Sequence, residues 1–503
     1  MSTLAPRPPY SDAELAALYP PQLRLQQVQV LLRHGERTPV KKRFAKTGLP
    51  AFWPYCSAVR QLRSVLSDGH NFSVLEWKRR LETIRPDGVP ATASGPGGEV
   101  DNICDLGMLT DRGRETTFQL GQRLRRLYVD QLGFLPAGVN ATTDFLYLRA
   151  TAVPRALESL QQTFHGLYPS HTRGPDFCPP TIVSRALPEE TLLPNFTHCR
   201  RFDVISRAFA QRAADRWNGS PEMDYLSKKL GKWMPEGNAR LAVDSHPRLS
   251  GVMDTINASL AHGPETRLPD EFYDPKVRQF LDKIVSEEWY AGFAESHEYR
   301  TLGIGGLMGD IVARMVESVE SPPSSSSSPS SPNPGKQQQA IRLSLSGCHD
   351  TTIAGTLASL GAFPNPSWPP FTSHVAIELF ERTSISGADS SSSQSSSPPW
   401  WSSLFGSSPS SGSIGRKLSP ELSENEKKRL QGYFVRVRYN DRPVTIPGCK
   451  PSGKHLDGDE SFCTLETFKA IVDKITPRNW KQQCGADPNA PAIPAEPQLA
   501  GYE

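Results

Sequence analysis

The 503-residue sequence lacks long apolar runs and lacks a strong excess of charge of either sign. No run of eighteen or more apolar residues occurs, so the sequence predicts no transmembrane helix. Its 56 basic and 53 acidic residues give a formal net charge of +3. This balance indicates neither a nucleic-acid-binding protein nor a chain with an acidic tail.

Common motifs for metals and nucleotides are also missing. The sequence contains no HExxH and no CxxC pair suited to zinc. The glycines of LGIGGLMGDIV (302–312) do not match GxGxxG, and no convincing strand precedes them. Close helix packing explains these glycines better than nucleotide binding. We therefore expect neither a metal nor a cofactor.

Features bearing on the cellular compartment point in opposite directions. Residues 1–24 lack the apolar segment of a secretory signal peptide, which favours an intracellular location. Yet there are five Asn-x-Ser/Thr sequons, which matter only in a secreted chain. The eight cysteines are too dilute to establish a disulfide framework. The sequons lie at Asn71, Asn140, Asn195, Asn218 and Asn257.

Two Ser-rich segments divide the chain, and their composition predicts disorder. They span 321–340 and 384–425, and the second lies between two expected strands, as a long hairpin loop would. Around them we expect a lead-in (1–24), the first part of an α/β core (25–180), an inserted helical cap (181–320), the second part of the core (341–485) and a tail (486–503).

Hydrophobic periodicity predicts the main elements of both parts. Residues 40–104 appear irregular, with Gly and Pro clusters near 86–98. Strands are expected at 25–32, 144–149, 341–347, 373–381 and 431–439. Core helices are expected at 111–129, 154–168 and 351–360, and cap helices at 203–216, 221–232, 274–293 and 304–319.

Three of the predicted strands lead into charged residues. Arg33, His34 and Arg37 follow the first strand, Arg149 and Arg155 lie at the second, and His349 and Asp350 follow the third. Ligands of α/β sheets bind at the carboxyl ends of the strands, so these residues can converge on one site.

The chemistry of this set suits a phosphate ester. Arginine forks match phosphate oxygens, and an imidazole such as His34 can attack phosphorus. Asp350 can then protonate the leaving group, which would give an acid pH optimum. Taken singly, each residue has an ordinary explanation: a histidine at a strand end is more often structural, and arginines often form surface salt bridges. The prediction depends on their conjunction.

Two segments carry a resemblance to a known family. VQVLLRHGERTP resembles the N-terminal signature Arg-His-Gly-x-Arg-x-Pro of the histidine acid phosphatases, and SGCHDTTIAGTLASLG resembles their second signature. FLYLRATAVPRALES resembles the segment that supplies a further phosphate-binding arginine, here Arg155. Ala152 and Pro154 depart from that pattern, because acidic residues are common at these positions.

The resemblance implies a role for each site residue. His34 would be the nucleophile and Asp350 the proton donor, with the phosphate held by Arg33, Arg37, Arg155 and His349. No metal is implied. The implied fold is a phosphoglycerate mutase-like α/β architecture, with a mostly parallel sheet flanked by helices and an inserted helical cap that selects the phosphomonoester.

Substrate and disulfides remain open at this stage. C-terminal segments such as GYFVRVRYNDRPVTIPGC resemble a branch that acts on lysophosphatidic acid. The same motifs also serve phytases, and a catalytically silent phosphate-binding scaffold is a third alternative. Cys449 and Cys463 flank a short loop and can pair under oxidising conditions, and the resemblance implies a Cys199–Cys484 pair. Reduced thiols are the alternative for all four.

Overall fold

The computed structural model describes residues 3–5, 7–57, 62–68, 71–235, 239–320, 340–383 and 413–502. The segment predicted to be disordered at 321–340 lies outside the described residues except for Ala340, and so does 384–412. Residues 413–425 are described, and there the prediction of disorder is wrong. Ile414 and Leu422 are buried in the same apolar cluster as the sheet.

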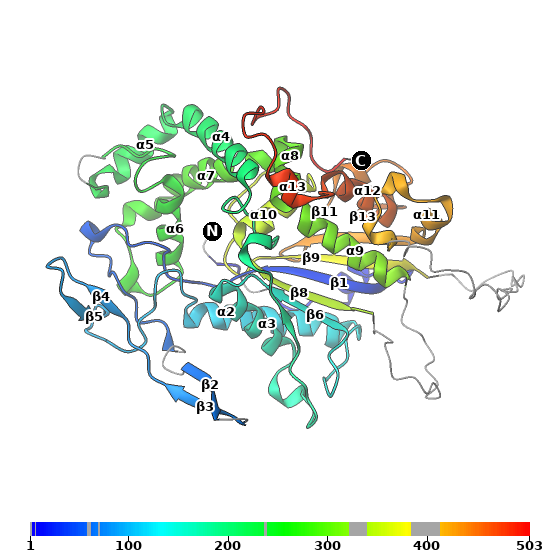
Figure 1. The fold of residues 1–503 in the computed structure, drawn as a ribbon, viewed down its shortest axis with the longest axis horizontal. Helices are drawn as coiled ribbons and strands as arrows, with labels where there is room; N and C mark the ends of the chain where they lie inside the picture. Colours follow the sequence, from blue (N-terminus) through cyan, green and yellow to red (C-terminus); the bar gives the residue numbers. More distant parts are fainter. Residues whose placement is uncertain are drawn as a thin grey trace, which may run out of the picture.

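A nine-stranded sheet forms the centre of the molecule (Figure 1). β1 (Leu23–Arg33) lies in the middle, with β9 on one side and β8 on the other. The full order is β12 (His455–Leu456), β13 (Asp459–Thr464), β10 (Tyr433–Tyr439), β9 (His374–Arg382), β1, β8 (Leu343–Cys348), β6 (Leu146–Ala150) and β7 (Ile182–Val183), with β11 (Arg442–Val444) paired to β10.

The sheet is mixed, so the expectation of a mostly parallel sheet is wrong. β1, β8, β6 and β7 pair in parallel, but β9, β10, β11, β13 and β12 all form antiparallel pairs. The turn between β10 and β11 shows why. Asn440 and Asp441 both have positive φ, which closes a tight hairpin, whereas a parallel pair needs a crossover helix.

Helices cover both faces of this sheet (Figure 1). Alternate residues of β1 point to opposite sides, and Val28, Val30 and Leu32 pack with α2 (Asp111–Arg125) and α3 (Pro154–Leu167). Leu31 faces the other layer. That layer contains α9 (Gly306–Glu320), α10 (Asp350–Ser359) and α12 (Leu465–Ile475), beside the shorter α8 (His297–Arg300), α11 (Glu424–Leu430) and α13 (Trp480–Cys484).

The predicted cap segment contains two apolar clusters. Its outer part has a core of its own, formed by α5 (Pro221–Leu230), α6 (Leu249–Leu260), most of α7 (Pro275–Glu295) and the end of α4 (Arg200–Trp217). The start of α4 and all of α9 instead pack with the sheet. The domain bounds themselves stay a prediction. α6 was not among the expected helices.

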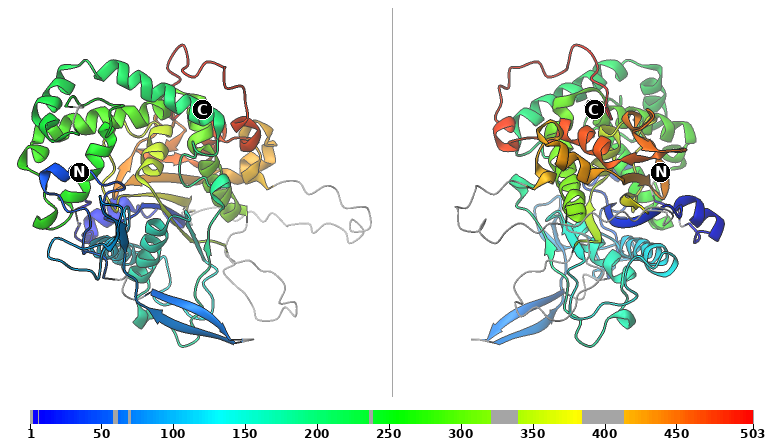
Figure 2. Two further views of the ribbon diagram at one scale, coloured as in Figure 1. Left: turned by 60° about the vertical axis from the view of Figure 1, so that its left-hand side comes forward. Right: turned by 90° about the vertical axis from the view of Figure 1, so that its right-hand side faces the viewer.

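The prediction that residues 40–104 are irregular missed two hairpins. β2 (Leu62–Asp68) pairs with β3 (Asn71–Trp77), and β4 (Glu82–Ile84) pairs with β5 (Pro90–Thr92). The β2–β3 hairpin projects away from the body (Figure 2). Phe72 and Val74 are exposed on this hairpin. Because it has no buried face, its sequence lacks the alternation of apolar and polar residues that predicts a strand. The lead-in contains α1 (Asp12–Leu18), opened by a Ser11–Glu14 capping box.

The described residues contain three disulfides. Both candidate pairs, Cys199–Cys484 and Cys449–Cys463, are formed. Cys56–Cys104, which was not predicted, is the third. Two of the sequons, at Asn195 and Asn257, have buried asparagine side chains in the folded protein.

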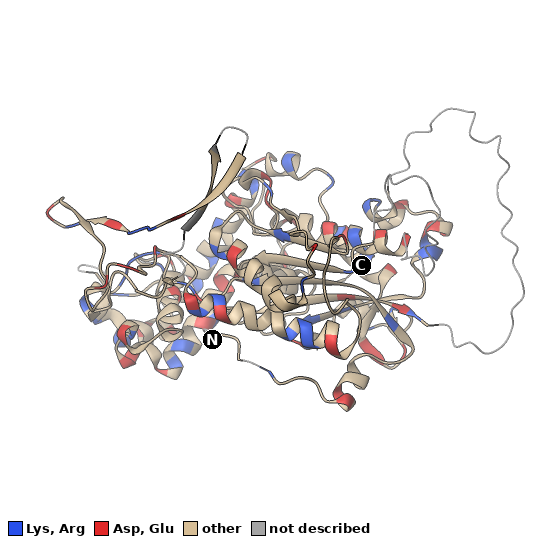
Figure 3. Cartoon of the chain, turned by 90° about the horizontal axis from the view of Figure 1, so that it is seen from below, with Lys and Arg blue, Asp and Glu red and all other residues tan. Residues whose placement is uncertain are grey.

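Charged residues of both signs are interspersed over the outer helices (Figure 3). This distribution agrees with the net charge near zero. Among the described residues, no helix is long and apolar enough to cross a membrane, and no three His, Cys, Asp or Glu side chains are grouped so that they could hold a metal ion.

Candidate active site

The carboxyl ends of β1, β8 and β6 lie side by side and bring the predicted residues together. Arg33 pairs in register with Cys348, and the His34 amide donates to the Cys348 carbonyl at 3.1 Å. On the other side, the Thr151 hydroxyl lies 3.0 Å from Nε2 of His349. The two histidine rings are 5.6 Å apart.

His34 is held as a neutral imidazole. Its ring is buried, and Nδ1 lies 2.9 Å from the Gly35 carbonyl, so Nδ1 carries the proton and donates it. Burial lowers the pKa of His34 well below its usual value, and the nearby cations, Arg155 first, lower it further. Nε2 makes no hydrogen bond with the described residues, so its lone pair is available.

Gly35 allows helix α2 to approach His34. A Cβ at Gly35 would lie 2.3 Å from the Gly113 carbonyl oxygen, and a Cβ at Gly113 would lie 2.2 Å from the Glu36 carbonyl oxygen. Both positions therefore need glycine. The Gly35 amide also donates to the Ser159 hydroxyl at 3.1 Å, which ties the His34 loop to α3.

Arg33 and Arg37 lie beside His34, and each is already paired with a carboxylate. Arg33 Nη2 lies 2.7 Å from Asp350 Oδ2, and Arg33 also donates to the Pro369 carbonyl. Arg37 Nη2 lies 2.8 Å from Oδ1 of Asp254, a residue of cap helix α6. The Nε atoms of both arginines are buried without a partner.

Arg155 is the unpaired cation of the group. It is the second residue of α3, directly after Pro154, and it has no carboxylate within ion-pair distance in the described part of the chain. Burial lowers its pKa to about 10, with a further contribution from Arg37, so it stays charged near neutral pH. Its fork is free to bind an anion at a helix N-terminus.

His349 and Asp350 begin helix α10. Burial lowers the pKa of His349 to about 3, with Arg155 adding to the effect, so this imidazole is also neutral. Burial alone would raise the pKa of Asp350, but the guanidinium groups of Arg33 and Arg37 outweigh it and hold the pKa below its usual value. Asp350 is therefore ionised in the free protein.

Arg149 does not join the site, although its strand ends there. Its side chain is completely buried, and Nη2 lies 2.6 Å from Glu190 Oε1. Asp310 lies 3.7 Å from Nη1. The strand pattern alone did not separate Arg149 from Arg155, because both flank the end of the same strand. The family resemblance chose Arg155.

Several residues at the site carried no recognisable sequence signal. Asp254 comes from a helix that was not predicted. Trp368 donates from its indole Nε1 to Asp350 Oδ2 at 3.2 Å, and the Phe371 ring lies 4.3 Å from the Arg33 guanidinium carbon.

A cavity of about 900 Å³ opens from Arg37 and Asp350 toward the cap. Its size suits a small organic ligand. One part of the wall is apolar and aromatic, with Phe44, Leu49, Trp53, Trp233, Trp289 and Trp368. Another part carries the cations Lys41, Lys42, Arg43, Lys46 and Arg248.

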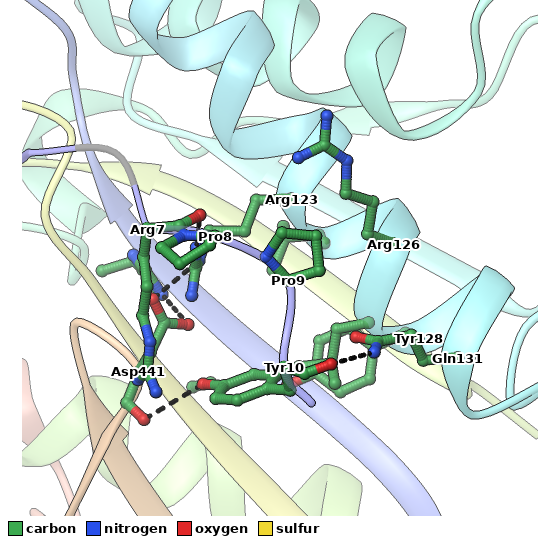
Figure 4. A pocket seen from close by; sticks show the side chains of 13 residues that line it. Arg7, Pro8, Pro9, Tyr10, Arg123, Arg126, Tyr128, Gln131 and Asp441 are labelled. Carbon is green, nitrogen blue, oxygen red and sulfur yellow. Dashed lines mark hydrogen bonds and ion pairs between the residues drawn. The ribbon is translucent and has the colours of Figure 1, made fainter. Parts of the chain in front are cut away.

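A second charged pocket, between the N-terminal segment and α2, is too small for a substrate (Figure 4). Its volume is about 20 Å³, which is room for about one water molecule. Tyr10 closes it, and Arg123 Nε lies 2.7 Å from Asp441 Oδ2. The Asp441 carboxylate of this pocket is thus paired with a cation, which identifies the group as a structural cluster.

Comparisons with known proteins identify the family of this chain. The profile of the histidine phosphatase superfamily (branch 2) matches residues 24–440. A "Probable acid phosphatase" of Schizosaccharomyces pombe is 36% identical over 477 residues, covering 94% of this chain and 97% of that protein. Lysophosphatidic acid phosphatase type 6 of Homo sapiens is 24% identical over 383 residues, covering 71% of this chain and 74% of that protein.

Solved structures agree on the fold. The multiple inositol polyphosphate phosphatase of Bifidobacterium longum, in complex with inositol hexasulfate, matches with a TM-score of 0.51 at 12% identity. The match covers 94% of this chain and 96% of that one. The predicted fold class is thus confirmed, as is the family resemblance. The chain belongs to branch 2 of the histidine phosphatase superfamily.

Proposed function

We propose that the protein is an acid phosphatase that hydrolyses phosphomonoesters through a phosphohistidine on His34. The observation that carries this proposal is a neutral imidazole, with Nε2 free, beside three arginines. A dianionic phosphoryl group would be attracted by Arg33, Arg37 and Arg155, and those same cations would stabilise the charge of the transferring group.

The reaction would proceed in two displacements. In the first, a bond forms between His34 Nε2 and phosphorus while the ester P–O bond breaks, and Asp350 gives its proton to the leaving oxygen. In the second, a water oxygen attacks phosphorus and the N–P bond breaks. Asp350 takes a proton from that water, so the enzyme returns to its starting state.

Asp350 must be protonated for the first step, although it is ionised in the free protein. A bound phosphate dianion beside Asp350 would raise its pKa, because like charges disfavour the ionised form. The dianion would also draw Arg33 away from its pair with Asp350. Lower pH also increases the protonated fraction of Asp350, which supports an acid optimum.

Lysophosphatidic acid is the substrate we favour. The cavity beside Asp350 has an aromatic wall that could hold an acyl chain, and a relative with 24% identity is named for this substrate. The cations that also line this cavity favour a second candidate, an inositol polyphosphate. Comparing kcat/KM on lysophosphatidate and on inositol hexakisphosphate decides between them, and a strong preference for the latter would overturn the first choice.

The mechanism is tested with His34→Ala. We expect kcat on a chromogenic aryl phosphate to fall by about 10³-fold or more, because the variant lacks the imidazole that accepts the phosphoryl group. Rapid quenching of wild type with a labelled substrate should trap an acid-labile phosphoenzyme. Retention of most activity by the variant would refute the role of His34. Folded wild type without turnover on a broad phosphomonoester panel would support the scaffold alternative.

We further propose that the disulfides form in an oxidising compartment. The sequence left open whether the cysteines are paired or reduced, and the three disulfides support pairing in an oxidising compartment. Protein isolated from its own source and denatured without reductant should then titrate two thiols, those of Cys178 and Cys348, out of eight cysteines. Eight reactive thiols would favour the intracellular alternative.

A further inference from the structure

The segment 368–373 contacts both the proposed nucleophile, His34, and the proposed proton donor, Asp350. The Ser373 carbonyl accepts the Arg33 amide at 2.8 Å, and the Thr372 amide donates to the His34 carbonyl at 3.3 Å. The Phe371 ring lies 6.0 Å from the ring of His34. At the other end of the segment, Trp368 reaches Asp350. One segment therefore contacts Arg33, His34 and Asp350 together.

Trp368 is fixed on three sides. Its backbone amide donates to Asp282 Oδ1 at 2.7 Å. Its ring stacks on Tyr290 with centroids 5.3 Å apart, and the ring of Trp289 meets it edge-on at 6.1 Å. The indole N–H has a fixed direction in the ring plane, so these contacts determine where it points. It points to Oδ2 of Asp350.

Asp350 Oδ2 receives two donors from different elements. One is Arg33 Nη2 of β1 at 2.7 Å, and the other is Trp368 Nε1 at 3.2 Å. Oδ1 accepts only the amide of the next residue, Thr351, at 2.9 Å. When a phosphate draws Arg33 toward itself, the Trp368 N–H is the side-chain donor that still fixes the carboxyl group.

Trp368 also lines the cavity on the side where the leaving group must lie. The cavity wall runs from Arg37 through Asp350 and Thr351 to Trp368. The leaving oxygen must meet the carboxyl group of Asp350 while the rest of the alcohol occupies that cavity. The same indole can therefore hold the proton donor with its N–H and contact the departing alcohol with its ring face.

We propose that Trp368 is a positioning residue that holds Asp350 in the geometry for protonating the leaving group. This inference rests on the proposed function, because it requires Asp350 to be the proton donor. Its consequence is selective. Substrates with poor leaving groups need the proton, whereas an activated aryl phosphate departs as a stable anion and needs it much less.

Trp368→Phe tests this role, because it removes the N–H and keeps an aromatic ring. We expect kcat on an alkyl phosphate such as glycerol phosphate to fall by about tenfold, the effect of losing one hydrogen bond to a charged group, and kcat on p-nitrophenyl phosphate to fall by less than about threefold. Equal losses on both substrates would overturn the proposal. If Trp368→Phe does not fold, Trp368→Tyr carries the same expectation.

Trp289→Phe is the matched control. Trp289 lines the same cavity and contacts the Trp368 ring, but its indole nitrogen has no hydrogen-bond partner among the described residues. We expect Trp289→Phe to change kcat by the same factor on glycerol phosphate and on p-nitrophenyl phosphate. A selective loss equal to that of Trp368→Phe would show that ring packing, and not the N–H, is responsible.

Asp350→Asn separates this inference from the proposed function. It should show the same selectivity more strongly. If Asp350→Asn loses activity equally on both substrates, Asp350 is not the proton donor and the proposed mechanism fails. If Asp350→Asn is selective but Trp368→Phe is not, the mechanism stands and only the role of Trp368 is overturned.

Discussion

Arg149 and Arg155 are six residues apart at the end of one strand, and they have opposite roles. Arg149 is fully buried against Glu190, with Asp310 close by. Arg155 is largely buried as well, but no carboxylate pairs with it in the described residues. A buried cation paired with a carboxylate contributes to the structure. A buried cation without one, at a helix N-terminus, is suited to bind an anion from outside.

The same contrast separates the two charged clusters of the molecule. Around Glu378, which is fully buried, Arg436 and Arg438 are paired with the carboxylate at 2.8 and 3.3 Å. Tyr19 of the N-terminal segment donates to the same carboxylate at 2.6 Å, so the cluster joins that segment to β9 and β10. The pocket nearby, lined by Tyr10, Tyr128 and Asp441, leaves room for about one water molecule (Figure 4). At the active site, the charged groups instead adjoin a cavity of about 900 Å³.

Arg149→Met should give the largest effect on stability. It leaves Glu190 buried without its cation, so we expect the free energy of unfolding in urea to fall by about 3–5 kcal/mol. The remaining folded protein should keep its kcat/KM. The control is Arg185→Met: Arg185 pairs with Asp310 in the same cluster, but its side chain is 34% exposed. There we expect a loss of about 1 kcal/mol or less.

Arg155→Ala should act on catalysis instead of stability. Removing one donor from the transferring phosphoryl group should lower kcat/KM by about 10²–10³-fold, with little change in Tm. Lys42→Ala, on the cavity wall away from His34, is the comparison variant. A loss below about threefold for Arg155→Ala would mean that Arg33 and Arg37 hold the phosphate alone.

The pH dependence of kcat/KM tests whether protonation of Asp350 limits the rate. Asp350 has a lowered pKa, so it is ionised at neutral pH and becomes protonated as pH falls. His34 also has a lowered pKa and stays neutral through pH 6.5. We therefore expect kcat/KM on an alkyl phosphate to rise by up to about tenfold per pH unit on acidification below neutral pH. A fall near pH 6.5 would contradict a neutral His34, and Asp350→Asn should flatten the profile.

Thr151→Val should give the smallest effect. Thr151 lies between Arg149 and Arg155 in the sequence. Its hydroxyl forms a hydrogen bond with His349 and would act on a bound phosphate only through that ring. Losing this bond should lower kcat by about threefold to tenfold, because His349 becomes less well oriented. Thr151→Ser keeps the hydroxyl and should stay close to wild type in the same assay.

The sequence could predict what depends on local pattern. Strand β1 with Arg33, His34 and Arg37, and the β8–α10 junction with His349 and Asp350, were predicted because a buried apolar run ending in charged residues is a local signal. Asp254 and Trp368 could not be predicted, because their roles depend on how the cap and the 368–373 segment fold over the site. The antiparallel half of the sheet was missed for a related reason: strand direction depends on connections.

The attachment points of the two Ser-rich segments have a practical consequence. Arg382 of β9 is opposite Leu23, at the start of β1, whereas His374 is opposite Leu32, next to the site. Leu343 likewise pairs with Val28, five residues before Arg33. Both segments therefore join the fold at the end of the sheet remote from His34. Fluorescent proteins or affinity tags placed there should leave turnover unchanged, which makes these positions the natural ones for building reporters of this enzyme.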